Sequence, residues 1–281
     1  MVSGDWNERL RASMRARASL VCVGLDPDPG KLPEPLRGMP VEDAIVAFNQ
    51  GIITATSDIA CAYKPNLGFY FAHGVPGLRA LERTRAMIPA STPAILDAKI
   101  GDIGSTAIAY AAGVFDTLGF DAVTLNPYLG EDSLQPFLSR PGKGLFILCK
   151  TSNPGSGDLQ DLDLDGRPLH LKVAERIAAW DATYPASAGL VVGATWPDQL
   201  AAVRAICPDQ PILLPGVGAQ SGDVAAALRA GVDRHGEGLV VTSSRAIIYA
   251  GSGPDWRDRA RDAAIALRDQ IEAERAAIRH A

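Results

Sequence analysis

Short apolar segments recur along the whole chain and alternate with stretches of helical period, and this alternation limits the possible folds more than any other feature. The segments are apolar at successive positions, which is typical of strands buried on both faces in a parallel sheet. Eight of them occur, at residues 19–25, 61–67, 93–99, 121–127, 144–150, 188–194, 211–217 and 238–244. Between them, stretches such as 41–56 and 170–182 carry apolar residues at helical spacing.

Eight strand and helix units favour an α/β fold of one kind, the (β/α)8 TIM barrel, over an open doubly wound sheet. The length of 281 residues alone would also allow two smaller domains. No segment reads as a linker, so we expect a single domain over residues 1–281. Residues 6–18 predict an extra N-terminal helix before the first strand, and residues 255–281 predict an amphipathic closing helix.

The composition narrows the possible partners. The net charge of -5 provides no basic field for nucleic acid or an anionic membrane, so any phosphate site must be local. No run approaches the roughly 18 apolar residues of a membrane span, and the N-terminus lacks the apolar middle of a signal peptide, which predicts a cytoplasmic protein. The four cysteines are widely spaced, which favours reduced thiols, and the four histidines show no metal-ligand spacing.

Charged residues lie where the predicted strands end. Asp26 follows the first strand, Lys64 lies in the second, and Asp97 and Lys99 end the third. Because the site of such a barrel is built at the carboxyl ends of the strands, these residues are candidate functional groups. Side chains two positions apart on a strand share a face, so Asp97 and Lys99 should both point into the barrel mouth.

Asp102 follows in the next turn, ahead of a helix that Ser105 or Thr106 could cap. The strand-end charges could form a purely structural ion-pair cluster. However, four or five charges that converge on one surface are costly to desolvate, which favours a functional role.

A second group of candidates lies late in the chain. Glycines at 216, 218 and 222 follow the seventh strand and would let backbone amides approach an anion. Ser243, Ser244 and Arg245 end the eighth strand and suit a phosphate. These two loops form the common phosphate site of barrels, although the glycines alone would fit an ordinary turn.

Five ordered motifs resemble those of the orotidine 5'-monophosphate decarboxylase family. They are GLDPD (24–28), YKPN (63–66), LDAKIGDIGSTA (96–107), KTSNPGS (150–156) and PGVGAQSGD (215–223). The third looks like the family's Asp-x-Lys-x-x-Asp signature, and KTSNPGS with the longer chain is similar to a bacterial subgroup. The family often carries Arg after the signature lysine, whereas this chain has Ile100.

The resemblance implies cofactor-independent decarboxylation of orotidine 5'-monophosphate to uridine 5'-monophosphate, the final step of pyrimidine nucleotide synthesis. Lys99 would deliver a proton to carbon 6 of the pyrimidine, and Asp97 would lie beside the substrate carboxylate. Lys64, Asp97, Lys99 and Asp102 would form an alternating charged network. The family also implies a homodimer with shared sites, in which Asp102 and Thr106 come from the neighbouring subunit.

The resemblance also implies a set of substrate contacts. Asp26 and Lys64 match positions that contact the ribose hydroxyls, and Ser152 matches the residue that hydrogen-bonds the pyrimidine amide. Pro215 belongs to the expected binding residues, and Gln220 and Arg245 match the phosphate grip. The polar stretch 153–170 is expected to be a long loop over the barrel mouth.

Two other functions remain open. A magnesium-dependent sugar-phosphate decarboxylase or hexulose-phosphate lyase of the same superfamily resembles the chain in its fold and signature. Those relatives place a carboxylate for magnesium on the second strand, where this chain has Lys64, which would repel a cation. A non-catalytic phosphate-binding barrel would have no need of Lys99.

Overall fold

The computed structural model describes residues 5–217 and 223–279, and its centre is an eight-stranded parallel sheet. All eight predicted strands are confirmed, with ends that shift by at most three residues. The strands are β1 (Val21–Leu25), β2 (Ala62–Pro65), β3 (Ile95–Ile100), β4 (Ala122–Leu125), β5 (Gly144–Lys150), β8 (Ser187–Val192), β9 (Ile212–Leu214) and β10 (Leu239–Ser243).

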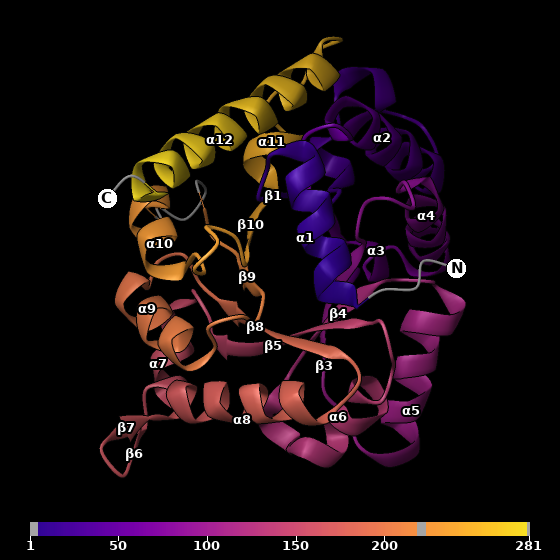
Figure 1. Cartoon of the computed structure of the whole chain (residues 1–281). Coiled ribbons are helices and arrows are strands. Elements are labelled where there is room, and N and C mark those ends of the chain that lie inside the picture. The colour runs from indigo at the N-terminus through magenta and orange to yellow at the C-terminus, as the bar shows by residue number, and fades with distance from the viewer. Residues whose placement is uncertain (1–4, 218–222, 280–281) are drawn as a thin grey trace.

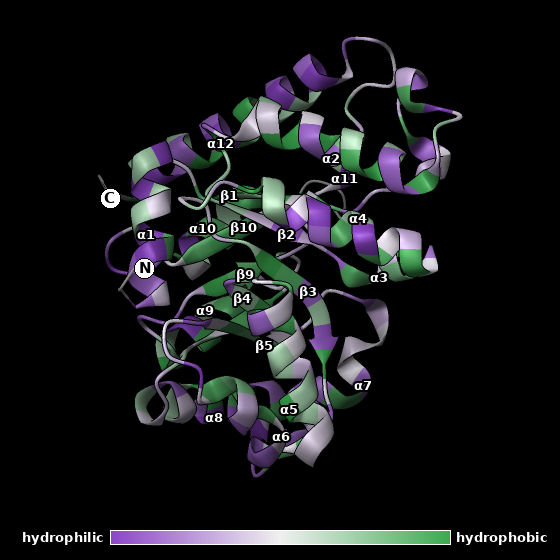
Figure 2. Cartoon of the chain, turned by 90° about the vertical axis from the view of Figure 1, so that its right-hand side faces the viewer, coloured by the Kyte–Doolittle hydropathy of each residue, from purple (hydrophilic) through white to green (hydrophobic). Residues whose placement is uncertain are grey.

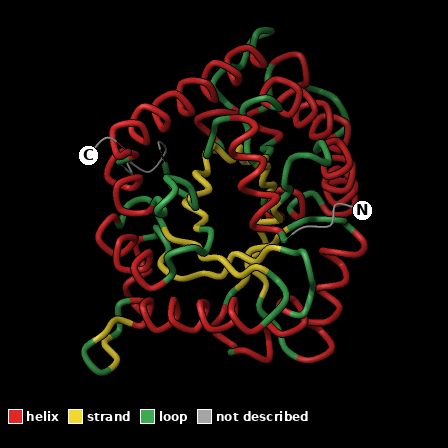
Figure 3. The backbone as a smooth tube through the Cα atoms, in the orientation of Figure 1, coloured by secondary structure: helices red, strands yellow, loops and turns green. Residues whose placement is uncertain are grey.

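The sheet curls into a nearly closed barrel, which confirms the predicted fold. Its strand order is β2-β1-β10-β9-β8-β5-β4-β3, so β2 and β3 are the edges that must meet. Two isolated bridges join them, between Tyr63 and Ala94 and between Asn66 and Asp97. Figure 3 shows the strands as a ring inside the helices. The carboxyl ends of all eight strands therefore open on the same side of the barrel.

Helices surround the barrel and separate its strands from solvent. Every residue of β1, β2, β4 and β8 is buried, whereas most of the helices carry their polar residues on the outer face (Figure 2). The helices are α1 (Trp6–Arg17), α2 (Val41–Thr56), α3 (Leu67–Phe71), α4 (Gly74–Met87), α5 (Gly104–Ala112), α6 (Glu131–Leu138), α7 (Gly157–Gln160), α8 (Leu169–Thr183), α9 (Pro197–Ile206), α10 (Val224–Gly231), α11 (Arg245–Ile248) and α12 (Trp256–Arg279). No described helix is long and apolar enough to cross a membrane.

The predicted N-terminal helix is α1, and it covers the amino end of the barrel (Figure 1). The Trp6 ring is fully buried against Gly144 at the start of β5, where a Cβ atom would lie 2.3 Å from the ring. The Ser13 hydroxyl donates to the carbonyl of Cys61, 2.7 Å away, just before β2. Helix α1 thus closes the end of the barrel opposite the strand-end charges.

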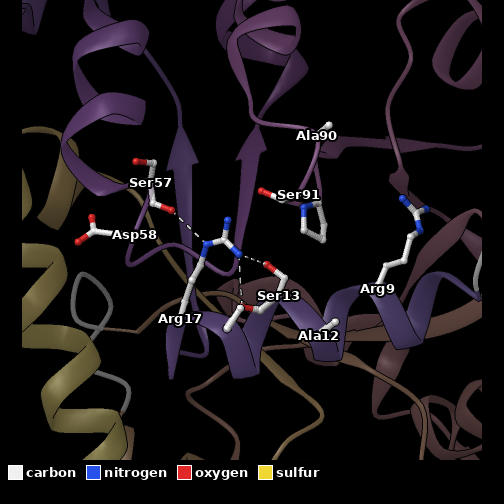
Figure 4. Close-up of a pocket in the computed structure, with 10 residues that line it drawn as sticks. Arg9, Ala12, Ser13, Arg17, Ser57, Asp58, Ala90 and Ser91 are labelled. Carbon is white, nitrogen blue, oxygen red and sulfur yellow. Dashed lines mark hydrogen bonds between the residues drawn. The ribbon is translucent and has the colours of Figure 1, made fainter. Parts of the chain in front are cut away.

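A cavity of about 560 Å³ lies beside α1 at this amino end (Figure 4). Arg17 crosses it and donates from Nε to the carbonyl of Ser57 and from Nη1 to the Ser13 hydroxyl, over 3.1 and 2.9 Å. The hydroxyl of Thr92 accepts a third hydrogen bond, 2.5 Å from Nη2. These contacts hold α1 against the loops that precede the strands. The cavity therefore lies at a packing interface between elements, and it is not the candidate site.

The segment 153–170 differs from the expected long loop over the barrel mouth. It contains a 3₁₀ turn at Pro154–Ser156, the short helix α7 and a hairpin of β6 (Asp163–Leu164) and β7 (Arg167–Pro168), and α8 begins at Leu169. The hairpin projects outward beyond α8 and does not lie over the mouth (Figures 1 and 3). Asp165 and Gly166 form its turn with positive φ, and Asp163 accepts from the amide of Gly166. Local turn chemistry therefore makes the hairpin.

Candidate active site

The carboxylate of Asp97, near the end of β3, is the centre of the charged cluster. Its Oδ2 lies 2.8 Å from Lys64 Nζ, and its Oδ1 lies 2.5 Å from Lys99 Nζ. The Asn66 amide also donates to Oδ2, over 3.3 Å. The sequence predicts that Asp97 and Lys99 both point into the barrel mouth, and the structure places the two side chains in contact. One carboxylate therefore holds two ammonium groups in fixed positions.

The two lysines differ in exposure. The side chain of Lys64 is 5% exposed and that of Asp97 9%, whereas that of Lys99 is 46% exposed. Burial by itself lowers the pKa of Lys64, but the nearby carboxylates of Asp97 and Asp26 outweigh burial and raise that pKa above its ordinary value. Lys99 is accordingly the cation that a substrate can reach, and Lys64 supports it from within the barrel.

The same cluster fixes the charge of the carboxylate. Burial alone raises the pKa of Asp97, but Lys64 and Lys99 outweigh that effect and hold the pKa far below its usual range. Asp97 is thus an anion at any physiological pH. A fixed negative charge flanked by cations suits a reaction in which charge develops on a bound molecule.

Strand β3 is irregular where it carries these groups. Its register with β4 shifts between Leu96 and Ile100, and Lys99 has φ of 49°, in the left-handed region. The Thr124 hydroxyl of β4 accepts from the backbone amides of Ala98 and Lys99, each over 2.9 Å. A β-bulge therefore sets the direction of the Lys99 side chain. The simple alternation of side chains along a regular strand does not predict this direction.

Asp26 lies beside Lys64 at the end of β1. Its Oδ1 accepts from the backbone amide of Asn66 over 3.2 Å, which joins the loops after β1 and β2. The Tyr249 hydroxyl accepts from the amide of Asp28 and donates to the carbonyl of Asp26. The structure thus brings Asp26, Lys64, Asp97 and Lys99 together, as the sequence predicts.

Asp102 stands apart from this cluster within the chain. Its carboxylate accepts from the adjacent amide of Ile103, and among the described residues it forms no ion pair with Lys64 or Lys99. The predicted capping of the following helix by Ser105 or Thr106 is wrong. Helix α5 begins at Gly104, which has positive φ, after the N-cap Ile103, and no side chain caps it. The glycine, not a hydroxyl, makes this turn.

The expected substrate-binding residues lie around the mouth with different exposures. Thr106 is exposed on α5, and Arg245 is exposed at the start of α11, directly after β10. Ser152 follows β5 and packs against Gly193 after β8, where a Cβ atom would lie 2.7 Å from that of Ser152. Pro215 follows β9, and its carbonyl accepts from the amide of Ala194. Gln220 lies outside the described residues.

Three polar residues near the strand ends were not among the candidates predicted from the sequence. Asn66 and Lys150 lie inside quoted motifs, and Thr124 is the one hydroxyl in the apolar segment 121–125. Lys150 is fully buried at the end of β5, where its ammonium lies 2.7 Å from Asp161 after α7 and 4.9 Å from the Trp196 ring centroid. For Thr124 and Lys150, a polar residue inside a strand that is otherwise apolar is the signal that could have identified them.

Comparison with known proteins agrees with this geometry. A model of the "Orotidine 5'-phosphate decarboxylase / HUMPS family" matches residues 19–255. The chain belongs to this family. The orotidine 5'-phosphate decarboxylase of Thermomicrobium roseum is 50% identical over 271 residues, which cover 95% of each chain. That of Roseiflexus castenholzii is 52% identical over 269 residues, 95% of this chain and 97% of the relative.

Solved structures of the family share the same fold. The structure of Leishmania donovani OMP decarboxylase matches with a TM-score of 0.84 at 39% identity, and the match covers 97% of this chain and 99% of that one. The family, the barrel and the enzyme class that the motifs imply are thereby confirmed. Since these relatives are named decarboxylases, the magnesium-dependent lyase is not favoured. Within the described residues, no group of three His, Cys, Asp or Glu side chains could hold a metal ion.

Proposed function

We propose that this chain decarboxylates orotidine 5'-monophosphate to uridine 5'-monophosphate with Lys99 as the proton donor and without a cofactor. The bond between carbon 6 and the carboxylate breaks, its electron pair stays on carbon 6, and a proton from the Lys99 ammonium replaces the carbon dioxide. The observation that carries this assignment is the half-exposed Lys99 Nζ held 2.5 Å from the buried Asp97 carboxylate.

The charged cluster suits this reaction physically. The electron pair left on carbon 6 has no adjacent electron sink, so stabilisation must come from fixed cations and hydrogen bonds that need no rearrangement. Lys99 faces the opening, and Lys64 and Asp97 are buried beneath it. We assign Asp97 a place beside the substrate carboxylate, with the Lys99 ammonium on the proton-donating side.

The remaining candidates surround the same mouth and would bind the rest of the nucleotide. We assign Asp26 and Lys64 to the ribose hydroxyls and Ser152 to the pyrimidine amide, with Pro215 alongside. Arg245 and Gln220 would hold the phosphate. Binding energy from a phosphate remote from carbon 6 can order the reacting end, so substrates without a phosphate should lose turnover as well as affinity.

A homodimer would complete the site. Asp102 makes no ion pair with the cluster in its own chain, which leaves it available to a neighbouring one. The surface around it is unusually apolar: Ile103, Ile108 and Tyr110 are 56%, 58% and 45% exposed on and before α5. We therefore propose that a second copy packs against α5 and contributes Asp102 and Thr106.

The test is the loss of orotidine 5'-monophosphate absorbance in excess EDTA, with uridine 5'-monophosphate identified as the product. Lys99→Ala should reduce kcat by at least about 1,000-fold, because one positioned proton donor and one fixed cation are lost together. Lys172→Ala on α8 removes a partly exposed lysine paired with Glu175 and should keep full activity. Turnover by Lys99→Ala equal to that of the wild type would reject the assignment. An intact, folded wild type that does not turn over orotidine 5'-monophosphate would favour the lyase, to be assayed on a sugar phosphate with magnesium restored.

The expected cytoplasmic location belongs to the same proposal. It is supported by the cysteines, since Cys22, Cys61, Cys149 and Cys207 are all free and buried. Burial raises the pKa of the Cys22 thiol to about 12, so it behaves as an inert core side chain. Free thiols fit a reducing compartment, where disulfides are rare.

A further inference from the structure

A single hydroxyl in β4 makes all of its possible hydrogen bonds to the residues that carry the chemistry. Thr124 is 1% exposed, and its Oγ1 accepts from the backbone amides of Ala98 and Lys99 over 2.9 Å each. It also donates to Asp97 Oδ1 over 3.0 Å. A hydroxyl has one proton and two lone pairs, so Thr124 uses its full capacity on three successive residues of β3.

These bonds coincide with the irregular part of β3. In a regular parallel pair, the amides of Ala98 and Lys99 would point alternately to the two neighbouring strands. Here both turn to the same oxygen of β4, and the register with β4 resumes at Ile100, paired with Leu125. The hydroxyl therefore replaces the backbone acceptors that the bulge takes away from these two amides.

The bulge holds Lys99 in a conformation that its own side chain disfavours. Three non-glycine residues of the described chain have positive φ, and Ala18 and Asp165 lie at a helix end and in a hairpin turn. Lys99, with φ of 49°, is the only one of them within a strand. Such a conformation is unfavourable for a residue with a side chain and persists where surrounding contacts fix it.

The carboxylate is fixed from both sides by the same arrangement. Asp97 Oδ1 accepts hydrogen bonds from Thr124 and Lys99, and Oδ2 accepts hydrogen bonds from Lys64 and Asn66. Without the hydroxyl, Oδ1 would lose its one neutral donor, and the carboxylate could rotate toward either lysine. The direction of the Lys99 ammonium depends on that rotation.

We infer that Thr124 is a positioning residue for the decarboxylation, which acts by holding the β3 bulge and the Asp97 carboxylate so that the Lys99 ammonium points at the reacting carbon. This inference rests on the proposed function. Thr124 is buried beneath the ion pairs, so it acts through Asp97 and Lys99 and makes no contact with substrate.

The deciding comparison is Thr124→Val against Thr124→Ser, because valine keeps the shape and serine keeps the hydroxyl. Thr124→Val should lower kcat by about 100-fold, the scale expected for a misplaced catalytic group, with KM changed by less than about threefold. Thr124→Ser should stay within about threefold of the wild type in both constants. A Val variant with wild-type kcat, or a loss of kcat that serine does not restore, would overturn the inference.

A matched control separates positioning from general loss of stability. Thr242 of β10 is also a buried threonine of the barrel, and its Oγ1 has no hydrogen-bond partner among the described residues. Thr242→Val should therefore leave kcat unchanged. If Thr124→Val does not fold, Thr124→Ala removes the same hydroxyl without crowding and replaces it in the comparison.

A crystal structure of the Val or Ala variant gives a readout that does not depend on activity. We expect Lys99 to leave the left-handed region and its ammonium to move away from Asp97 Oδ1. An unchanged bulge and ion pair would refute the positioning role even if turnover fell. If the wild type and Thr124→Ser both failed to decarboxylate orotidine 5'-monophosphate, the proposed function itself would fail, whatever the bulge does.

Discussion

At the scale of single residues, the site depends on the unequal environments of two lysines around one carboxylate. Lys64 is buried and Lys99 is half-exposed, yet both contact Asp97. A buried ion pair is costly to break from one side, because the partner that remains is left without compensation. The carboxylate should therefore matter to the stability of the barrel as well as to its chemistry.

Replacing Asp97 tests this dual role. Asp97→Asn should lower the free energy of unfolding by about 3 kcal/mol at pH 7, because buried Lys64 loses its counter-ion. The pKa of Asp97 lies below the ordinary value of about 3.9. The stabilisation by the ionised carboxylate is therefore present above about pH 4 and is lost as the pH falls through the folded-state pKa. The difference in unfolding free energy between the wild type and Asp97→Asn should therefore become smaller on acidification.

Urea denaturation at pH 7 and at acidic pH, at one fixed protein concentration, measures this gap. Asp258→Asn on the exposed face of α12 is the matched control and should change the unfolding free energy by less than about 0.5 kcal/mol. A gap that widens on acidification would contradict the assigned direction of the pKa shift.

At the scale of elements, the segment after β5 is tied to the barrel by a second charged group. Lys150 is fully buried, and Asp161, which follows α7, is 45% exposed. His170 at the start of α8 also contacts Asp161, over 3.3 Å, and its Nδ1 lies 2.9 Å from the carbonyl of Gln160. The short helix α7 is too small to be stable alone, so these contacts hold it in place.

The two halves of this pair should respond unequally to substitution. Asp161→Asn leaves the buried ammonium of Lys150 without a carboxylate and should cost about 3 kcal/mol. Lys150→Met leaves the half-exposed Asp161, which water can solvate, and should cost about 1 kcal/mol. Thermal denaturation measures the difference, and Lys172→Met on α8 serves as the control. A larger loss in Lys150→Met than in Asp161→Asn would refute the argument from burial.

At the scale of the whole molecule, the two ends of the barrel have separate tasks. The amino end is closed by α1, where Arg11 and Arg15 form ion pairs with Glu237 before β10. The carboxyl end carries the charged cluster and the apolar surface of α5. A second copy that covers this surface would assemble two complete mouths from two incomplete ones.

Hybrid dimers test the shared site. Asp102→Ala and Lys99→Ala should each lose nearly all activity alone. When the two proteins exchange subunits, one mouth of each hybrid contains both an intact Lys99 and an intact Asp102, so roughly a quarter of wild-type activity should return in an equal mixture. Mass spectrometry of the mixture confirms exchange. No recovery after complete exchange would show that each mouth uses its own Asp102.

The sequence predicts the barrel and most of the cluster because both follow from simple periodicity. Eight apolar segments give the strands, and charges at their ends give Asp26, Lys64, Asp97 and Lys99. The bulge at Lys99 was not predictable, because it depends on a hydroxyl of the next strand that accepts two amides at once. The hairpin at 163–168 was missed because a segment of acidic residues and glycine gives no strand pattern.

The position of α1 has a practical consequence for handling the protein. Asp5, which precedes α1, accepts a hydrogen bond from Ser187 at the start of β8, so the described chain begins at the amino end of the barrel. A tether attached before Asp5 would hold the protein by the end that α1 covers. The mouth would then face the solution, and a sensor surface or flow reactor could carry the protein without screening its strand-end charges.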